Sequence, residues 1–123
     1  MKKKVLIIED HPETVEVMET IMKPLGVEVL VAYDGITGSK LAVSGKPDLI
    51  LLDIMMPEMN GFEVCRRLKA DPETAKIPIV IVSVRTSEDD KENGNKCGAD
   101  EYLTKPFDPK KLLEVVGRYL GKA

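Results

Sequence analysis

Three short runs of apolar residues constrain the fold of this chain more than any other feature. They occupy residues 5–8, 49–52 and 79–82, and a polar or charged residue follows each run. An apolar run this short, with no polar residue alternating in it, is typical of a strand buried on both faces of a sheet. Such a sheet needs helices on both faces, so the runs predict an α/β fold.

The rest of the chain alternates between further strand and helix patterns. We predict strands over residues 4–8, 27–33, 48–53, 77–83 and 100–104, and helices over residues 12–25, 36–43, 61–70 and 109–120. Right-handed crossovers between parallel strands leave few topologies for this order. No repeat, linker or low-complexity segment interrupts it. The sequence therefore predicts a single α/β domain over residues 1–123.

Composition excludes several classes of function. The chain has 123 residues, 43% hydrophobic and 32% charged, and a net charge of −3, which argues against broad binding to nucleic acid or anionic membranes. Only four apolar residues follow the N-terminal lysines, too few for a signal peptide or a membrane span. We expect a cytoplasmic protein in which Cys65 and Cys97, which lack metal-site spacing, are free thiols.

Polar side chains stand at the ends of several predicted strands. Glu9 and Asp10 follow the first strand, Asp53 ends the third, Ser83 ends the fourth, and Lys105 follows the fifth. Ligands of open parallel sheets bind at the carboxyl ends of the strands. If the first and third strands are neighbours, the three carboxylates converge there.

Three converging carboxylates repel one another unless a cation offsets their charge. An all-oxygen set without histidine or cysteine favours a hard cation, most simply Mg²⁺. Such a metal can bridge a carboxylate and a phosphoryl group, which would make Asp53 a nucleophile that forms an aspartyl-phosphate. Lys105 and the Ser83 hydroxyl would each hold one phosphoryl oxygen.

Several motifs together resemble the receiver domain of two-component response regulators, in a stand-alone form similar to the chemotaxis receivers. The motifs occur in the expected order and cover essentially the whole chain: Glu9-Asp10, Asp53, Met56-Pro57 with Gly61, Ser83, Gly98-Ala99-Asp100, Tyr102 and Lys105-Pro106-Phe107. The resemblance implies a flavodoxin-like (βα)5 fold with a parallel sheet in the order 2-1-3-4-5.

The resemblance also assigns a role to each residue near the phosphoacceptor. Asp53 would accept the phosphoryl group from a histidine kinase or a histidine phosphotransfer protein. Asp10, Asp53 and the backbone carbonyl of Met55 would ligate Mg²⁺, and Glu9 would act mainly through a water molecule. Lys105 would precede Pro106 in a cis peptide bond.

The switch and its output follow from the same resemblance. Ser83 would turn towards the phosphoryl group, and Tyr102 would move inward behind it. The signal would pass to an unidentified downstream protein through the face formed by the fourth helix, the fifth strand and the fifth helix. No direct nucleic-acid or membrane partner is expected. The sequence leaves open whether the protein is a monomer or a phosphorylation-dependent dimer, and whether the receiver belongs to a longer regulator.

Two regions depart from the usual receiver pattern. Val84 stands where Ala or Gly is common, and Met55 and Arg85 also flank the site, so we expect restricted access and a long-lived phosphoryl state. Residues 87–97 contain no Leu, Ile, Val or Ala, and Gly94 disfavours a helix by about 1 kcal/mol relative to Ala. We therefore predict a short, frayed or mobile fourth helix in the unphosphorylated state.

Two other classes of protein compete with this interpretation. A Mg²⁺-dependent phosphohydrolase would also use Asp53 as nucleophile, but it needs a second acid close after it, where this chain has Met55. A flavin mononucleotide-binding module would need a phosphate loop rich in Ser, Thr or Gly after the first strand. The chain has Glu9, Asp10, His11 and Pro12 there.

Overall fold

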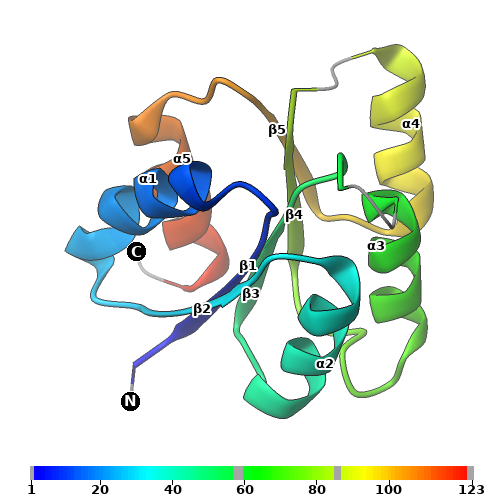
Figure 1. Cartoon of the computed structure of the whole chain (residues 1–123), viewed down its shortest axis with the longest axis horizontal. Coiled ribbons are helices and arrows are strands. Elements are labelled where there is room, and N and C mark those ends of the chain that lie inside the picture. The colour runs from blue at the N-terminus through cyan, green and yellow to red at the C-terminus, as the bar shows by residue number, and fades with distance from the viewer. Residues whose placement is uncertain (1, 57–59, 85–86, 122–123) are drawn as a thin grey trace.

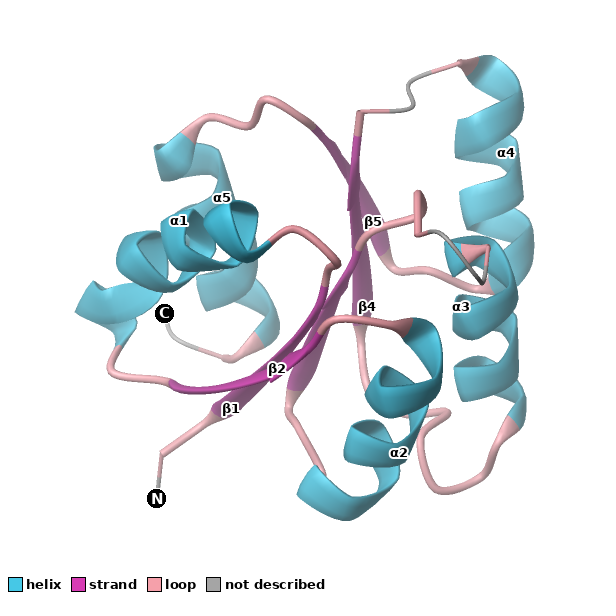
Figure 2. Cartoon of the chain, in the orientation of Figure 1, coloured by secondary structure: helices cyan, strands magenta, loops and turns pink. Residues whose placement is uncertain are grey.

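The structure, a computed structural model, describes residues 2–56, 60–84 and 87–121. In these residues five parallel strands form one sheet with helices on both faces (Figures 1 and 2). The strand order is β2-β1-β3-β4-β5, which confirms the predicted topology. The strands are β1 (Lys4–Ile8), β2 (Glu28–Ala32), β3 (Leu49–Leu52), β4 (Ile79–Ser83) and β5 (Glu101–Thr104).

The helices divide into two layers, as Figure 1 shows. Helices α1 and α5 cover one face of the sheet, and α2, α3 and α4 cover the other. The helices are α1 (Pro12–Met22), followed by the 3-10 turn η1 (Lys23–Leu25), α2 (Gly35–Gly45), α3 (Gly61–Ala70), α4 (Glu88–Cys97) and α5 (Pro109–Tyr119).

The wholly apolar strands follow from this sandwich. Leu6 and Ile8 of β1 point into the core on the side of α2, α3 and α4, whereas Val5 and Ile7 point into the core on the side of α1 and α5. Successive residues of a strand face opposite sides of the sheet, so both sets must be apolar. All four side chains are fully buried.

Some predicted boundaries differ from those in the structure. The strand predicted over residues 48–53 ends at Leu52, so Asp53 lies just beyond its last residue. The helix predicted over residues 12–25 is α-helical only to Met22 and ends in the 3-10 turn η1. Pro24 explains the change, because it has no backbone N–H to continue the α-helical hydrogen bonds.

The prediction of a short or frayed fourth helix is wrong in its length. Helix α4 runs unbroken through ten residues, Glu88–Cys97. The Ser87 side chain caps its N-terminus by accepting the N–H of Asp90 at 3.1 Å. Acidic residues in the first turn favour the helix dipole, and Gly98 ends the helix in a left-handed conformation (φ 93°). Mobility of this helix stays a prediction.

Gly94 allows close packing, although it lowers helix propensity. A Cβ atom at position 94 would lie 3.0 Å from Cδ2 of Tyr102 and 3.5 Å from Cδ1 of Ile81. The missing side chain therefore lets α4 lie close to β5 and β4. The inward face of α4 consists of Asp90, Gly94 and Cys97, a set that hydrophobic periodicity does not detect.

Candidate functional site

The predicted site residues meet at the carboxyl edge of the sheet. β1 pairs with β3 through Ile8 and Leu52, so Glu9 and Asp53, one residue beyond each, are neighbours. Ser83 ends β4 and pairs with Thr104 of β5, which places Lys105 next to it. The convergence predicted from strand order is therefore present in the structure.

The acidic cluster is buried to different degrees. Glu9 is 1% exposed and Asp53 is 4% exposed, whereas the Asp10 side chain is 19% exposed. One ligand atom from each of Glu9, Asp10, His11 and Asp53 lies within 4.8 Å of the others. A buried carboxylate cluster of this kind needs compensating positive charge.

Lys105 supplies part of that charge. Its Nζ forms an ion pair with Oε1 of Glu9 and lies 3.5 Å from Oδ2 of Asp53. Burial tends to raise the pKa of Glu9, but hydrogen bonds from Lys105 and His11 outweigh it and hold that pKa below its ordinary value. Burial and the charge of Glu9 raise the pKa of Asp53 to about 6, because Lys105 compensates Asp53 less completely.

His11, the residue before α1, also contacts the cluster. Its Nδ1 lies 2.8 Å from Oε2 of Glu9 and 3.2 Å from Oδ1 of Asp10. The hydrogen bond to Glu9 and the charge of Asp10 raise the pKa of His11. His11 was not among the predicted site residues, although its position directly after the acidic pair was an available signal.

The turn after β3 fixes the orientation of Asp53. The backbone N–H of Met55 donates to Oδ1 of Asp53 at 3.2 Å, and Met55 forms an isolated bridge with Asn60. A Cβ atom at Gly61 would lie 2.5 Å from the backbone oxygen of Asp53 and from Cα of Ile54. Only glycine therefore fits where α3 begins. Residues 57–59, including Pro57 of the predicted motif, lie outside the described residues.

The two predicted switch residues lie on adjacent strands. Ser83 is fully buried at the end of β4, and Tyr102 is half-buried on β5, where it pairs with Ile81 and packs against Gly94. The Lys105 N–H donates to the backbone oxygen of Ser83 at 2.8 Å. The Lys105–Pro106 peptide bond is cis, as the resemblance implied.

The flanking residues are placed as the sequence suggested, with one exception. The side chains of Val84 and Met55 are 57% and 50% exposed, beside the ends of β4 and β3. Arg85, the third residue expected to flank the site, lies outside the described residues. Their effect on the phosphoryl lifetime stays a prediction.

The residues present fit a hard divalent cation. Asp10 and Asp53 offer carboxylate oxygens within one cluster, and the part of the Met55 carbonyl stays a prediction. Among the described residues, Oδ1 of Asp10 is buried and has no hydrogen-bond partner, although Nδ1 of His11 lies 3.2 Å away. A buried carboxylate oxygen without a donor is what a bound cation satisfies.

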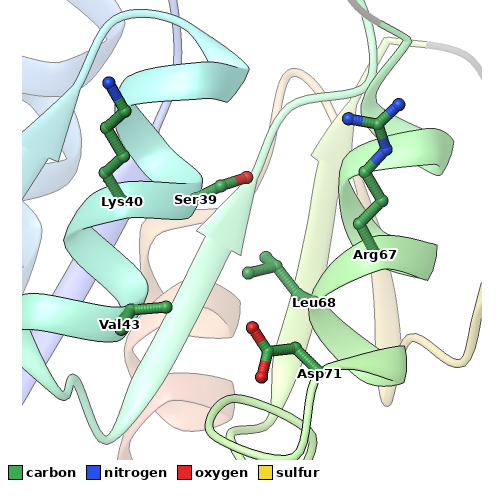
Figure 3. A pocket seen from close by; sticks show the side chains of 6 residues that line it. All are labelled: Ser39, Lys40, Val43, Arg67, Leu68 and Asp71. Atoms are coloured by element: carbon green, nitrogen blue, oxygen red, sulfur yellow. The ribbon is translucent and has the colours of Figure 1, made fainter.

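A separate cavity of about 430 Å³ lies between α2 and α3 (Figure 3). Val43 and Leu68 face each other across it, and Lys40 and Arg67 direct their charged ends away from its centre. No member of the acidic cluster lines this cavity. It is therefore not part of the candidate site.

The family model described as "Response regulator receiver domain" matches residues 5–117. The chain belongs to the response regulator receiver domains. Receiver domains are phosphoacceptor switches of two-component signalling, not metabolic enzymes, and they interact with histidine kinases or phosphotransfer proteins. They bind Mg²⁺ in the acidic site. This membership weighs against the phosphohydrolase and flavin-binding alternatives.

Proteins similar to this chain include both longer regulators and proteins of about its own length. The chain is 44% identical over 119 residues to the DNA-binding dual master transcriptional regulator RpaA of Synechocystis, covering 97% of this chain and 49% of RpaA. It is 40% identical to the Protein PilH of Pseudomonas aeruginosa, covering 96% of this chain and 98% of PilH. The chain thus spans about half of RpaA and nearly all of PilH.

A solved receiver domain supports the comparison of the sites. The structure of the receiver domain of sensor histidine kinase PA1611 from P. aeruginosa PAO1 has a TM-score of 0.89 and 29% identity, covering 98% of this chain and 99% of that chain. That structure holds a magnesium ion coordinated in its active-site cleft.

No helix in the described part of this receiver domain is long and apolar enough to cross a membrane.

Proposed function

We propose that Asp53 accepts a phosphoryl group from the phosphohistidine of a histidine kinase or a histidine phosphotransfer protein. The observation that supports this most is the pairing of Lys105 with Glu9. Lys105 contacts Glu9 directly and Asp53 only at 3.5 Å, which leaves the Asp53 carboxylate less neutralised. A buried carboxylate in this environment can act as a nucleophile, since no strong ion pair neutralises its charge.

In the proposed transfer, an Asp53 carboxylate oxygen attacks the phosphorus as the phosphorus–nitrogen bond to the donor imidazole breaks. Mg²⁺, when bound by Asp10, Asp53 and the Met55 carbonyl, supplies charge neutralisation for the phosphoryl oxygens. The Met55 N–H holds one oxygen of Asp53 and thereby orients the carboxylate. Lys105 is close enough to move its ammonium group from Asp53 to a phosphoryl oxygen.

The proposed switch begins at Ser83, whose hydroxyl binds a phosphoryl oxygen. Tyr102 then moves further inward from its half-buried position beside Gly94. Because Tyr102 contacts α4, this motion changes the face formed by α4, β5 and α5. We propose that a downstream protein recognises that face. We also propose that the same face determines whether the protein is a monomer or a phosphorylation-dependent dimer.

The same residues make the receiver domain a participant in its own phosphorylation and dephosphorylation. This chain positions Asp53, the cation and Lys105, and the donor supplies only the phosphoryl group. The free thiols and the kinase partner fit a cytoplasmic location.

The test is an intact-mass measurement after incubation with a small phosphodonor and Mg²⁺. We expect one phosphoryl adduct in the wild-type protein and none in Asp53→Ala. Asp89→Ala, a change at an exposed aspartate of α4, is the matched control and should behave as wild type. An adduct that survives in Asp53→Ala, or no adduct with any small donor or kinase, would refute the proposal.

A further inference from the structure

The two cysteines are 32 residues apart in sequence but adjacent in space. Cys65 lies on α3 and Cys97 is the last residue of α4, two helices that run side by side on one face of the sheet (Figure 1). Both belong to the same buried cluster. The Sγ of Cys65 donates to the backbone oxygen of Cys97 at 3.5 Å.

The two thiols also differ in character. Hydrogen bonding with Cys97 and burial raise the pKa of Cys65. The neighbouring Cys65 side chain lowers the pKa of Cys97. Of the two thiols, Cys97 is therefore the more acidic. The more acidic thiol of a pair reaches the nucleophilic thiolate form more readily, so Cys97 is the thiol that reacts first with an oxidant.

The positions of the two cysteines in their helices also favour reaction at Cys97 before Cys65. Cys65 is fully buried, whereas Cys97 is 4% exposed at the end of α4, where Gly98 ends the helix. Terminal helix residues open more readily than interior ones. Both thiols are buried in the folded state, and opening of the last turn of α4 would expose Cys97 before Cys65.

We propose that Cys65 and Cys97 form a reversible disulfide when the receiver domain meets a peroxide. The Cys97 thiolate attacks one peroxide oxygen, the O–O bond breaks, and hydroxide leaves as a sulfenic acid forms on Cys97. The Cys65 sulfur then attacks the Cys97 sulfur and displaces water. In sum, two thiols and one hydrogen peroxide give one disulfide and two waters, and a thiol reductant restores the thiols.

The disulfide would tie the last turn of α4 to α3. It would also remove the hydrogen bond that the Cys97 thiol donates to the Gly94 backbone oxygen at 3.2 Å. Gly94 is the position against which Tyr102 packs. Oxidation is thus expected to change the face proposed for the output partner. This consequence rests on the proposed function, whereas disulfide formation does not.

The disulfide is tested on the full chain with hydrogen peroxide and no phosphodonor. After denaturation in an alkylating reagent, the wild-type mass should show the loss of two hydrogens with both cysteines unalkylated, and a reductant should reverse it. Peptide mapping should join the α3 and α4 peptides. Two fully alkylated thiols, a cross-link between separate chains, or irreversible oxidation of Cys97 without a cross-link would each overturn the proposal.

Single variants test the order of the steps. In Cys65→Ala the sulfenic acid on Cys97 should accumulate and be trapped by dimedone, whereas Cys97→Ala should leave Cys65 unoxidised. Equal trapping in both variants would refute the assigned roles. The wild-type mass measurement needs no variant, so it remains decisive even if a variant folds poorly. Phosphorylation of Asp53 is measured separately, so failure of one proposal is distinguishable from failure of the other.

Discussion

Replacing Asp53 by asparagine is expected to stabilise the metal-free receiver domain at neutral pH, although it removes the proposed phosphoacceptor. Asp53 is buried beside Glu9, and Lys105 forms its stronger ion pair with Glu9. The folded state therefore disfavours the ionised carboxylate. An asparagine keeps the acceptor oxygen for the Met55 N–H and carries no charge.

The pKa of Asp53 gives the size of the effect. It rises from 3.8 to about 6 in the folded protein. At about 1.4 kcal/mol for each unit, ionisation of Asp53 would destabilise the fold by up to roughly 3 kcal/mol. Water that reaches the site screens part of this, so we expect about 1–2 kcal/mol. Stability from this group is fully present below its unfolded pKa and is lost as the pH rises through about 6.

Urea unfolding with a chelator, at about pH 4 and about pH 8, measures this contribution. Asp53→Asn should have the higher midpoint at the higher pH, and the difference should shrink at the lower pH. Asp89→Asn makes the same chemical change at an exposed position and should show no such pH dependence. Added Mg²⁺ should stabilise the wild type more than Asp53→Asn. A variant no more stable than wild type at the higher pH would refute the reasoning.

Three other substitutions test separate parts of the structure. Gly61→Ala should destabilise the fold by about 1–3 kcal/mol in urea and slow phosphorylation, because its Cβ would meet the Asp53 backbone at 2.5 Å. Val84→Ala should change the rates of phosphorylation by a small donor and of hydrolysis by more than about twofold, and smaller changes in both would contradict restricted access. Ser87→Ala should lower stability by about 1 kcal/mol and reduce amide protection in the first turn of α4, since it removes the cap on Asp90; unchanged protection would show that the cap is not needed.

Elements were predicted correctly from the sequence where apolar residues follow the repeat of a buried strand or of an amphipathic helix. Apolar runs identified the buried strands, and strand order then brought Glu9 and Asp53 together, since residues that follow neighbouring parallel strands share one edge of the sheet. The start and end of α3 were also predicted correctly, because Asn60 caps it and an apolar stripe defines its inward face.

Reasoning from the sequence failed where a contact depends on distant partners. The ion pair of Lys105 with Glu9 joins residues 96 positions apart, and nothing local indicates that Lys105 contacts Glu9 more closely than Asp53. The length of α4 was missed for a similar reason. Its stabilising neighbours, Tyr102 and Cys65, lie on other elements, so its polar sequence is a poor guide to its structure.

The composition of α4 bears on how a receiver domain can transmit a signal. Its inward face is Asp90, Gly94 and Cys97, so burial of large apolar side chains contributes little to holding it in place. The capping interactions at Ser87 and Gly98 and the close approach to Tyr102 contribute instead. The contact of Cys97 with Cys65 on α3 adds to these. A helix held without large buried apolar side chains of its own can shift when a neighbouring aromatic moves, without disrupting a large core. If Tyr102 moves as proposed, the residues that weaken the sequence signal for a helix are therefore also the ones that would let α4 respond to it.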